Sequence, residues 1–314
     1  MNKKRVLAML LAGAMALSMT ACGGNSASTD GSSNDGGASA SGGSYKVSVI
    51  LKTLAAEYWQ YVKSGAEDYA SEHSDKVTVE VKGPSSETAF DEMQNMIETD
   101  LSSGSYDGIV ISPLQSDTAA QLVSGTKLPI VAIDTNFTAP EVKSFVGTGN
   151  EAAAKKGGEA AVEAAKAAGW TDIKCIEIAG VQGDQTNTAR MNGYKAGVEE
   201  AGGTFLSDEV QYADATADRA TTAMEAIMQT HPEGIAIICA NNDDMAMAAA
   251  RAAQGHDAYK NTIFLGFNGD RAACEAILAG QMTMSVAQMA YEMGYKAVET
   301  MVQVLDGETV DEFV

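Results

Sequence analysis

Short apolar runs alternate with longer amphipathic segments over most of the chain after residue 44. The runs are shorter than ordinary helices and almost wholly apolar, as expected of strands that are covered on both faces. Eight runs are predicted strands: residues 47–52, 77–81, 108–112, 130–134, 173–178, 234–240, 263–267 and 282–287. Strands that alternate with helices form β-α-β units, so the pattern predicts an α/β protein with parallel sheets covered by helices.

The segments between these strands carry Ala, Glu, Lys and Met at helical spacing. Five of them are predicted helices: residues 57–69, 152–168, 186–201, 217–229 and 289–305. Gly202 and Gly203 end the third helix, and His231 and Pro232 end the fourth. The body that begins at Tyr45 has about 270 residues, which favours two domains over one oversized core.

The first 44 residues follow a different pattern. A basic tip precedes an apolar stretch at residues 6–17 that is too short to span a bilayer stably, and small residues precede Cys22. These features predict a secretory signal peptide at residues 1–21. The small residues before Cys22 resemble the lipobox of bacterial lipoproteins, although Met19 stands where Leu is more usual. The resemblance implies that Cys22 is lipidated and becomes the new N-terminus.

Residues 22–44 consist of the cysteine and a tract made almost entirely of small and polar residues. Such a tract cannot bury apolar area, and it predicts a flexible tether with a root-mean-square span of roughly 25 Å. Two other interpretations of Cys22 stay open, an ordinary cleavage site with a chance cysteine and an uncleaved anchor. With lipidation, the body is expected outside the cytoplasm, anchored to the membrane by Cys22.

Composition excludes several classes of function. The hydrophobic fraction of 45% is that of an ordinary globular protein, and the formal net charge is −21. That charge repels the phosphates of nucleic acid and argues against a basic membrane-binding face. Small soluble molecules are therefore the expected partners.

The residues of the body give no sign of metal, cofactor or catalytic chemistry. Cys175, Cys239 and Cys274 lack the spacing of a zinc site or a disulfide framework, and their redox state stays open. No nucleophile elbow, P-loop or HExxH motif is present, and the helix start at residues 149–151 lacks the dinucleotide fingerprint. The expectation is a protein that is not an enzyme and has no cofactor.

Polar side chains follow the ends of several predicted strands, where open parallel sheets bind their ligands. Aromatic side chains of Tyr58 and Trp59 follow the first strand. Asp, Asn, Gln and Lys supply donors and acceptors for hydroxyl groups, and aromatic faces pack against C–H surfaces. This combination favours a polyhydroxylated ligand such as a sugar. The polar residues at these ends are Lys52, Asp134, Asn136, Asp184, Gln185, Asn242, Asn268 and Gln288.

Several segments of the body match one family in order and at the family's spacing. They are VSVILKTLAAEYWQYVKSGAED, DGIVISPLQSD, PIVAIDTN, TARMNGYKAG, ICANNDDMAMAAARAA, FLGFNGD and AGQMTMSVAQ. Together they resemble the ribose-type and especially the allose-type periplasmic sugar-binding proteins of ABC transporters, over nearly the whole body. This resemblance implies two Rossmann-like lobes that are joined by crossing strands and close on a ligand between them.

The resemblance also implies the lobe boundaries. The N-terminal lobe comprises residues 45–147 and 289–314, and the C-terminal lobe comprises residues 148–288. The chain is expected to cross between lobes near Val146 and near Gln288, with a third crossing beyond the last residue given.

Carried over by position, the family's sugar contacts fall on Lys52, Tyr58, Trp59, Asp134, Arg190, Asn242 and Gln288. Lys52 is expected to donate to ring hydroxyls, and Tyr58 and Trp59 to stack on the sugar. Other roles stay open: an interlobe salt bridge between Asp134 and Arg190, or a capping or hinge role for the two amides.

This chain departs from the family at three of its positions. Ala56 replaces an Asn, Ala215 replaces an aromatic residue, and Asn268 replaces an Asp that binds two hydroxyls. The last change exchanges a charge-assisted hydrogen bond of about 1.5–3 kcal/mol for a neutral one. Asn268 stays in the predicted contact set.

Three further positions are secondary candidates for the site: Asn136, Asp184 and Gln185. The last two are unusually polar for their loop and resemble the autoinducer-2-binding branch of the same fold, which also has a Lys at the position of Lys52.

The function implied is that of an extracytoplasmic solute-binding lipoprotein of an ABC importer. It would capture a monosaccharide or related polyol, close around it and deliver it to a membrane permease. A monomer is expected. The alternative is a sensor that presents its closed, sugar-bound or autoinducer-bound form to a signalling receptor. A DNA-binding regulator would need a helix-turn-helix at its N-terminus, where the lipobox-like sequence lies.

Overall fold

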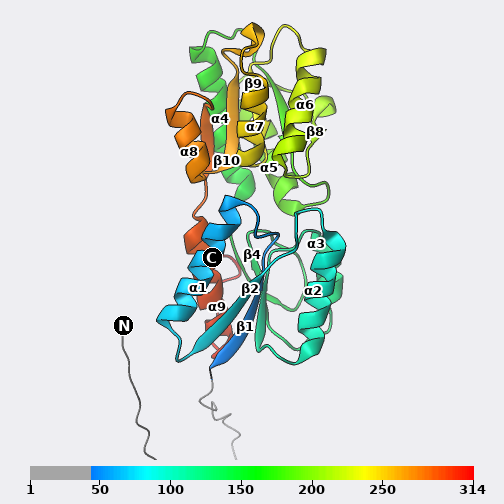
Figure 1. Cartoon of the computed structure of the whole chain (residues 1–314), viewed down its shortest axis with the longest axis vertical. Coiled ribbons are helices and arrows are strands. Elements are labelled where there is room, and N and C mark those ends of the chain that lie inside the picture. The colour runs from blue at the N-terminus through cyan, green and yellow to red at the C-terminus, as the bar shows by residue number, and fades with distance from the viewer. Residues whose placement is uncertain (1–43) are drawn as a thin grey trace, which may run out of the picture. The chain divides into compact units, whose positions relative to one another are not determined.

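Two parallel β-sheets organise residues 44–314, the part of the chain that the computed structural model describes (Figure 1). The first sheet has the strand order β2-β1-β3-β4-β5, and the second has the order β11-β10-β9-β6-β7 with β8 beside β6. The predicted α/β class with parallel sheets is confirmed. The predicted signal peptide, Cys22 and nearly all of the tether lie outside the described residues.

The strands are β1 (Tyr45–Ile50), β2 (Val77–Lys82), β3 (Gly108–Ile111), β4 (Ile130–Ile133), β5 (Val142–Val146), β6 (Lys174–Ala179), β7 (Thr204–Phe205), β8 (Gln211–Tyr212), β9 (Ile237–Ala240), β10 (Ile263–Asn268) and β11 (Met284–Ala287). The helices are α1 (Glu57–Glu72), α2 (Phe90–Ser103), α3 (Ser116–Val123), α4 (Asn150–Ala167), α5 (Gln185–Glu200), α6 (Ala217–Thr230), α7 (Asp243–Ala252), α8 (Arg271–Leu278) and α9 (Ala290–Leu305).

We call the elements around the first sheet the N-terminal lobe. Helices α1 and α9 cover one face of this sheet, and α2 and α3 cover the other. Alternate residues of β1 point into the two resulting cores, with Val49 toward α1 and α9 and Ile50 toward α2 and α3. Helices α1 and α9 touch at glycines: a Cβ on Gly294 would overlap the backbone oxygen of Val62. The close contact holds α9 in this lobe although it comes last in sequence.

We call the elements around the second sheet the C-terminal lobe. Helices α4 and α5 cover one face, and α6 and α7 cover the other. On β6, Cys175 faces the α4–α5 side and Ile176 faces the α6–α7 side. Both cores are dominated by aliphatic side chains, with Cys175 and Cys239 as buried free thiols in the first of them.

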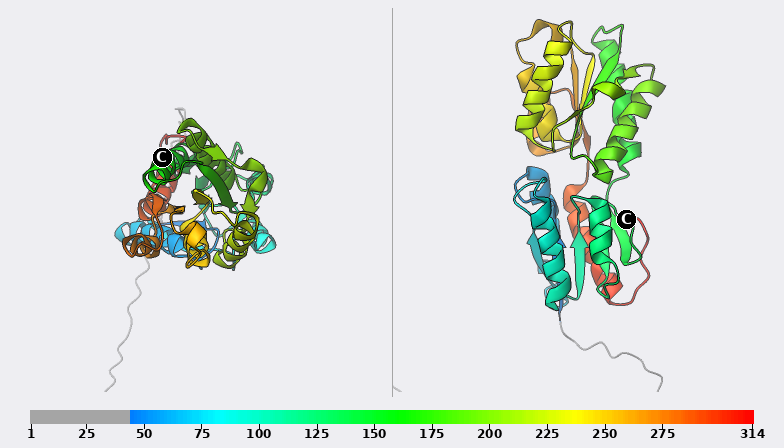
Figure 2. Two further views of the ribbon diagram at one scale, coloured as in Figure 1. Left: turned by 90° about the horizontal axis from the view of Figure 1, so that it is seen from above. Right: turned by 90° about the vertical axis from the view of Figure 1, so that its right-hand side faces the viewer.

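Two chain segments connect the lobes. The chain leaves β5 through residues 147–149 to enter α4, and it returns from β11 through residues 288–289 to α9. Figure 2 shows α9 packed in the lobe that holds the N-terminal elements. The two connections are hydrogen-bonded to each other, because the Thr148 hydroxyl donates to Gln288 Oε1 at 2.8 Å. At the other end of the chain, Phe313 forms a parallel bridge with Phe145 of β5.

Several elements were absent from the sequence prediction. Strand β5 alternates buried and partly exposed residues, so it lacks the continuous apolar run that marks a covered strand. The strands β7 and β8 are only two residues long. Helices α2, α3, α7 and α8 were also not among the predicted helices. No helix in the described part of the chain combines the length and apolar character needed to cross a bilayer.

One carboxyl group is buried in the C-terminal lobe without a hydrogen-bond partner. Glu177 on β6 has no exposed surface, and neither of its carboxyl oxygens is hydrogen-bonded within residues 44–314. Burial raises the pKa of Glu177 to about 8, with the neighbouring Asn241 side chain and then the charge of Arg190 acting in the opposite direction. The side chain is therefore protonated in the folded protein at neutral pH.

We expect Glu177 to make the folded protein less stable as pH rises. In the unfolded chain this group titrates near 4.5, so between that value and about 8 the folded state holds a proton that the unfolded state has released. The free energy of unfolding should therefore fall with rising pH across this window. Glu177→Gln removes the titration and should raise stability at pH 8 by about 4 kcal/mol. Denaturant unfolding at several pH values measures this.

Glu163→Gln, at an exposed position on α4, is the matched control and should leave the pH profile of unfolding unchanged. A Glu177→Gln profile that keeps the slope of the parent protein would contradict the assignment.

Candidate functional site

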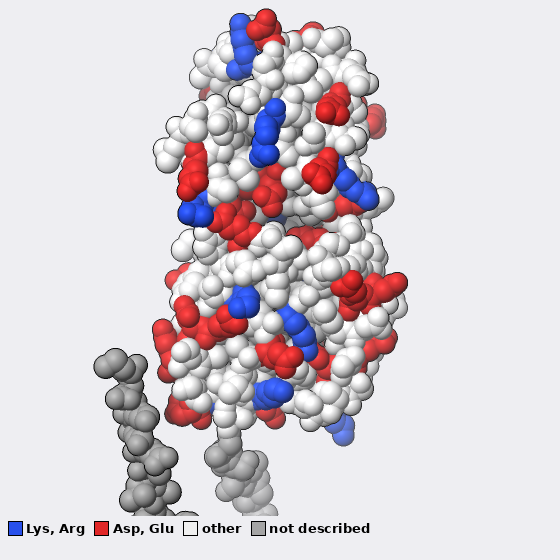
Figure 3. Space-filling view, in the orientation of Figure 1, with Lys and Arg blue, Asp and Glu red and all other residues white. Residues whose placement is uncertain are grey.

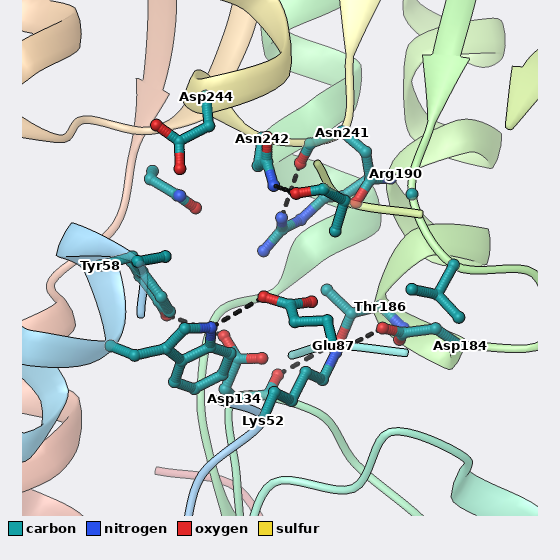
Figure 4. A pocket seen from close by; sticks show the side chains of 16 residues that line it. Lys52, Tyr58, Glu87, Asp134, Asp184, Thr186, Arg190, Asn241, Asn242 and Asp244 are labelled. Atoms are coloured by element: carbon teal, nitrogen blue, oxygen red, sulfur yellow. Dashed lines mark hydrogen bonds and ion pairs between the residues drawn. The ribbon is translucent and has the colours of Figure 1, made fainter. Parts of the chain in front are cut away.

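A cavity lies where the carboxyl ends of strands from both sheets meet (Figure 4). Both lobes contribute polar side chains to it. Its lining residues are Lys52, Ala56, Tyr58, Trp59, Glu87, Asp134, Gly180, Val181, Asp184, Thr186, Arg190, Ala215, Asn241, Asn242, Asp244 and Asn268.

Asp134 is the central acceptor on the N-terminal side. It follows β4, is 3% exposed, and accepts hydrogen bonds from the Tyr58 hydroxyl at 2.7 Å and the Thr135 hydroxyl at 2.9 Å. Its backbone is left-handed, with φ of 61°, a conformation that Asp adopts more readily than most residues. Burial, followed by the charge of Asp134, raises the pKa of Tyr58 well above its usual value, so Tyr58 remains a hydrogen-bond donor.

Trp59 and Glu87 form a second pair on the same side. The Trp59 indole N–H donates to Glu87 Oε1 at 2.9 Å, and the Trp59 ring meets the Tyr58 ring edge-on at a centroid distance of 5.0 Å. Trp59 is 3% exposed. The bond to Glu87 fixes the orientation of the indole, so one polar contact holds the largest apolar surface of the site.

Arg190 is the central donor on the C-terminal side. Its Nε donates to Asn150 Oδ1 at 2.8 Å, its Nη1 donates to the Asn241 carbonyl at 2.8 Å, and its guanidinium lies 3.9 Å from the Phe267 ring centroid. These contacts hold the group in one orientation and leave further N–H groups for a ligand. Among the described residues, Arg190 forms no salt bridge with Asp134, so that alternative is not observed.

Two helices begin at the cavity, and a lining residue caps each of them. Asp184 caps α5 by accepting from the Thr186 amide at 2.7 Å. Asn242 caps α7 by accepting from the Met245 amide at 2.9 Å, and it donates to the Ala215 carbonyl at 3.1 Å. The capping role considered for Asn242 is therefore observed. The positive ends of both helix dipoles face the cavity and favour ligand oxygens there.

Contacts across the cavity hold the two lobes together. The Lys52 ammonium forms a buried ion pair with Asp184, and the Thr135 and Thr186 hydroxyls are 2.8 Å apart. At the rim, Glu57 of α1 accepts from the Ala272 amide of α8 at 3.2 Å. Burial by itself would lower the pKa of Lys52, but the charges of Asp184 and Asp134 outweigh it and raise that pKa. The structure is therefore a closed arrangement in which Lys52 is charged.

Most of the residues predicted from the sequence line the cavity: Lys52, Tyr58, Trp59, Asp134, Asp184, Arg190, Asn242 and Asn268. Three predicted residues do not. Asn136 and Gln185 are exposed, and Gln288 lies in the connection between lobes, where its Nε2 donates to Asn268 Oδ1 at 2.9 Å. The hinge role considered for Gln288 fits this position better than direct contact with a ligand.

Four polar lining residues were missed: Glu87, Thr186, Asn241 and Asp244. Asn241 is the first residue of the NND sequence after β9 and Asp244 directly follows that sequence, so their position at a strand end was a signal that could have found them. Glu87 lies in the loop between β2 and α2, where the sequence offers no comparable signal.

Metal-binding chemistry has no support in the described residues. Within residues 44–314, no group of three or more His, Cys, Asp or Glu side chains is placed to hold a metal ion.

Comparison with known proteins identifies what this architecture resembles. The family described as "Periplasmic binding protein domain" matches residues 47–309. The D-allose-binding periplasmic protein of Escherichia coli is 30% identical over 264 residues, covering 81% of this chain and 82% of that protein. The ribose import binding protein of Bacillus subtilis is 26% identical and covers 86% of this chain and 85% of its own length.

Solved structures share the fold. A carbohydrate transporter solute-binding protein from Agrobacterium radiobacter, in complex with D-arabinose, aligns with a TM-score of 0.78 at 24% identity. The alignment covers 86% of this chain and 92% of that one. The glucose-galactose binding protein GanP from Geobacillus stearothermophilus aligns with a TM-score of 0.78 at 23% identity, covering 87% and 95% of the two chains.

We expect Lys52 to control how far the ligand-free protein is closed. Lys52→Met leaves Asp184 buried without its partner, which should destabilise the closed arrangement by about 3–5 kcal/mol. Small-angle X-ray scattering of the ligand-free variant should then give a larger radius of gyration than that of the parent. Lys63→Met, which breaks an exposed pair with Glu67 within α1, is the matched control. Equal radii for all three proteins would show that the Lys52–Asp184 pair does not hold the lobes closed.

Proposed function

Because the chain belongs to the periplasmic binding protein family, we propose that it captures a monosaccharide or related polyol by closure of its two lobes. The proteins of this family bind substrates for transport outside the cytoplasm and are not enzymes. The prediction of an extracytoplasmic protein that is not an enzyme therefore agrees with the family.

The observation that carries the proposal is the composition of the cavity. Fixed donors and acceptors from both lobes converge with two aromatic side chains on one enclosed space. A ligand that contacts both lobes stabilises the closed form, because it gains contacts there that the open form cannot provide. Asp134 from one side and Arg190 from the other supply hydrogen bonds of opposite polarity, as vicinal hydroxyl groups require.

The proposed contact residues keep the roles expected from the sequence. Tyr58 and Trp59 provide the apolar surface for C–H groups, and Lys52 has donors left beyond its bond to Asp184. The relatives are named for D-allose, ribose and D-apiose, which are monosaccharides. The identity of the sugar for this chain depends on the positions where it departs from the family, namely Ala56, Ala215 and Asn268.

The surface agrees with a small-molecule ligand. Figure 3 shows acidic side chains on both lobes of the face drawn, with fewer basic ones among them. Together with the net charge of −21, this distribution disfavours binding of nucleic acid.

Delivery and anchoring are part of the proposal. The lobes are assigned as residues 45–147 with 289–314 and residues 148–288, and hinge motion occurs at the two connections between them. Lipidation of Cys22 tethers the monomeric body to the membrane, and a membrane permease of the ABC type accepts the closed form.

A second candidate function is a ligand sensor for an autoinducer-2-like or sugar ligand that presents its closed form to a signalling receptor. The observation that favours it is the position of Asp184 in the cavity, paired with Lys52. Both residues belong to the pattern shared with the autoinducer-2-binding branch, although Gln185 is exposed.

Arg190→Ala should abolish ligand binding and leave the fold intact. The variant removes the central donor of the C-terminal lobe, and a lost charge-assisted hydrogen bond costs about 1.5–3 kcal/mol, or more where its partners stay buried. Isothermal titration calorimetry measures the binding, and circular dichroism checks the fold. Arg251→Ala, at an exposed position in the same lobe, should bind as the parent does. Unchanged affinity in folded Arg190→Ala would refute the assigned site.

A thermal-shift panel on the body from residue 45 onward should identify the ligand. Pentoses, hexoses, deoxysugars, polyols and autoinducer-2 are the compounds to compare. A ligand at 100 times its dissociation constant should stabilise the protein by about 2.7 kcal/mol. A selective shift with one sugar or polyol supports the solute-binding function, and a shift with autoinducer-2 alone supports the sensor. A folded protein that responds to none of them is incompatible with the proposal.

A further inference from the structure

The cavity contains more negative than positive side chains. Its carboxylates are Glu87, Asp134, Asp184 and Asp244, and its cations are Lys52 and Arg190. The lining therefore has an excess of two negative charges when all of these groups are ionised. In an enclosed space of low dielectric, such an excess is costly unless a ligand or protons compensate it.

Two of the four carboxylates are already satisfied by neighbours. Asp184 uses one oxygen for Lys52 and the other for the N-terminus of α5. Asp134 uses its two oxygens for the Tyr58 and Thr135 hydroxyls. Glu87 and Asp244 differ from these, because no Lys, Arg or His within residues 44–314 forms an ion pair with either one.

Glu87 is fixed in its place. Its loop begins at Gly83, where a Cβ would overlap the backbone oxygen of Leu51, so the loop lies tightly against the end of β1. Ser85 is bonded through both its amide and its hydroxyl to Glu92 of α2, at 2.7 and 2.8 Å. Glu87 follows two residues later, and one of its oxygens is held by Trp59.

The second oxygen of Glu87 has no partner among the described residues. In Figure 4, the Glu87 carboxylate lies in the space between Arg190 and Asp134, within the cavity itself. Burial raises the pKa of Glu87, while the nearby charge of Lys52 acts in the opposite direction. Glu87 is half-buried, and the charge of its carboxylate is only partly compensated by Lys52.

The two cations of the cavity are outnumbered by its four carboxylates, although Arg190 keeps N–H groups for a ligand. Lys52 is paired with Asp184, and Arg190 is held by Asn150, the Asn241 carbonyl and the Phe267 ring. A carboxylate or phosphate on the ligand would add to an existing negative excess. An ammonium group would reduce that excess and would pair with Glu87 in a charge-assisted hydrogen bond.

We infer that the ligand is an aminated sugar or aminated polyol whose ammonium group is bound by Glu87. This inference rests on the proposed function, because it assigns the ligand of the same cavity. Glu87 then makes the cavity bind aminated ligands more tightly than their neutral and acidic analogues.

The test compares matched compounds on several carbon frameworks by isothermal titration calorimetry at pH 7.5. For glucose, galactose and mannose, the probes are the neutral hexose, its 2-amino-2-deoxy form, the N-acetylated form and the uronic acid. Ribitol and glucitol are compared with their 1-amino-1-deoxy forms. On at least one framework, the aminated compound should bind at least tenfold more tightly than its neutral parent, and the N-acetylated and acidic forms should bind no better than that parent.

Glu87→Gln is the decisive variant, since the amide oxygen can still accept from Trp59 but carries no charge. It should remove the preference for the amine, so that the aminated compound and its neutral parent bind the variant with affinities within about threefold of each other. Glu98→Gln, at an exposed position on α2, should keep the preference. High salt should not abolish the preference for the amine in the parent protein, because the ion pair between Glu87 and the ligand lies within the cavity, where salt screens it little.

The outcomes separate the inference from the function on which it rests. Neutral compounds that bind as tightly as their aminated forms on every framework overturn the inference and leave the proposed function standing. A preference for the amine that survives in Glu87→Gln also overturns it, because another group would then be the partner. If a folded protein binds none of the neutral or aminated compounds, both the inference and the proposed function fail.

Discussion

The carboxyl ends of two parallel sheets meet at one cavity, and the site depends on this constraint. In a parallel sheet all strands run the same way, so the segments that follow them gather at one edge. Lys52 follows β1, Asp134 follows β4, and Asn242 follows β9, although nearly 200 residues separate the first from the last. Hydrogen bonds within the sheets pair the backbone up to each of these positions. The side chains beyond the strand ends can therefore interact with a ligand.

Several residues at this edge serve the fold and the site together. Asp184 caps α5 and pairs with Lys52 across the cavity, and Asn242 caps α7 and holds the Ala215 carbonyl. Asp134 and Asn268 both have positive φ, a conformation that most side chains disfavour. The large apolar cores of the two lobes stabilise the molecule enough to maintain such strained and polar positions where a ligand would bind.

Ionisable side chains away from bulk solvent are compensated in three different ways in this protein. Lys52 and Asp184 form a buried ion pair, and the charges of Asp184 and Asp134 raise the pKa of Lys52. Glu177 has no partner in the described residues and is neutralised by holding a proton. Glu87 has only the indole N–H of Trp59 and is left partly uncompensated inside the cavity. A carboxylate of this third kind in a binding cavity points to a positive charge on the ligand, because the nearby Lys52 compensates it only in part.

The sequence by itself determined the fold class and half of the residues that line the cavity. Continuous apolar runs marked the covered strands, and polar residues at their ends marked the edge where Asp134, Asn242 and Asn268 lie, because strand direction ties a local pattern to a place in the fold. Only the tertiary structure decided which distant groups meet. It placed Glu87 beside Trp59, paired Lys52 with Asp184, and moved Gln288 from the cavity to the connection between lobes. These outcomes depend on how loops and lobes pack, which no spacing along the chain records.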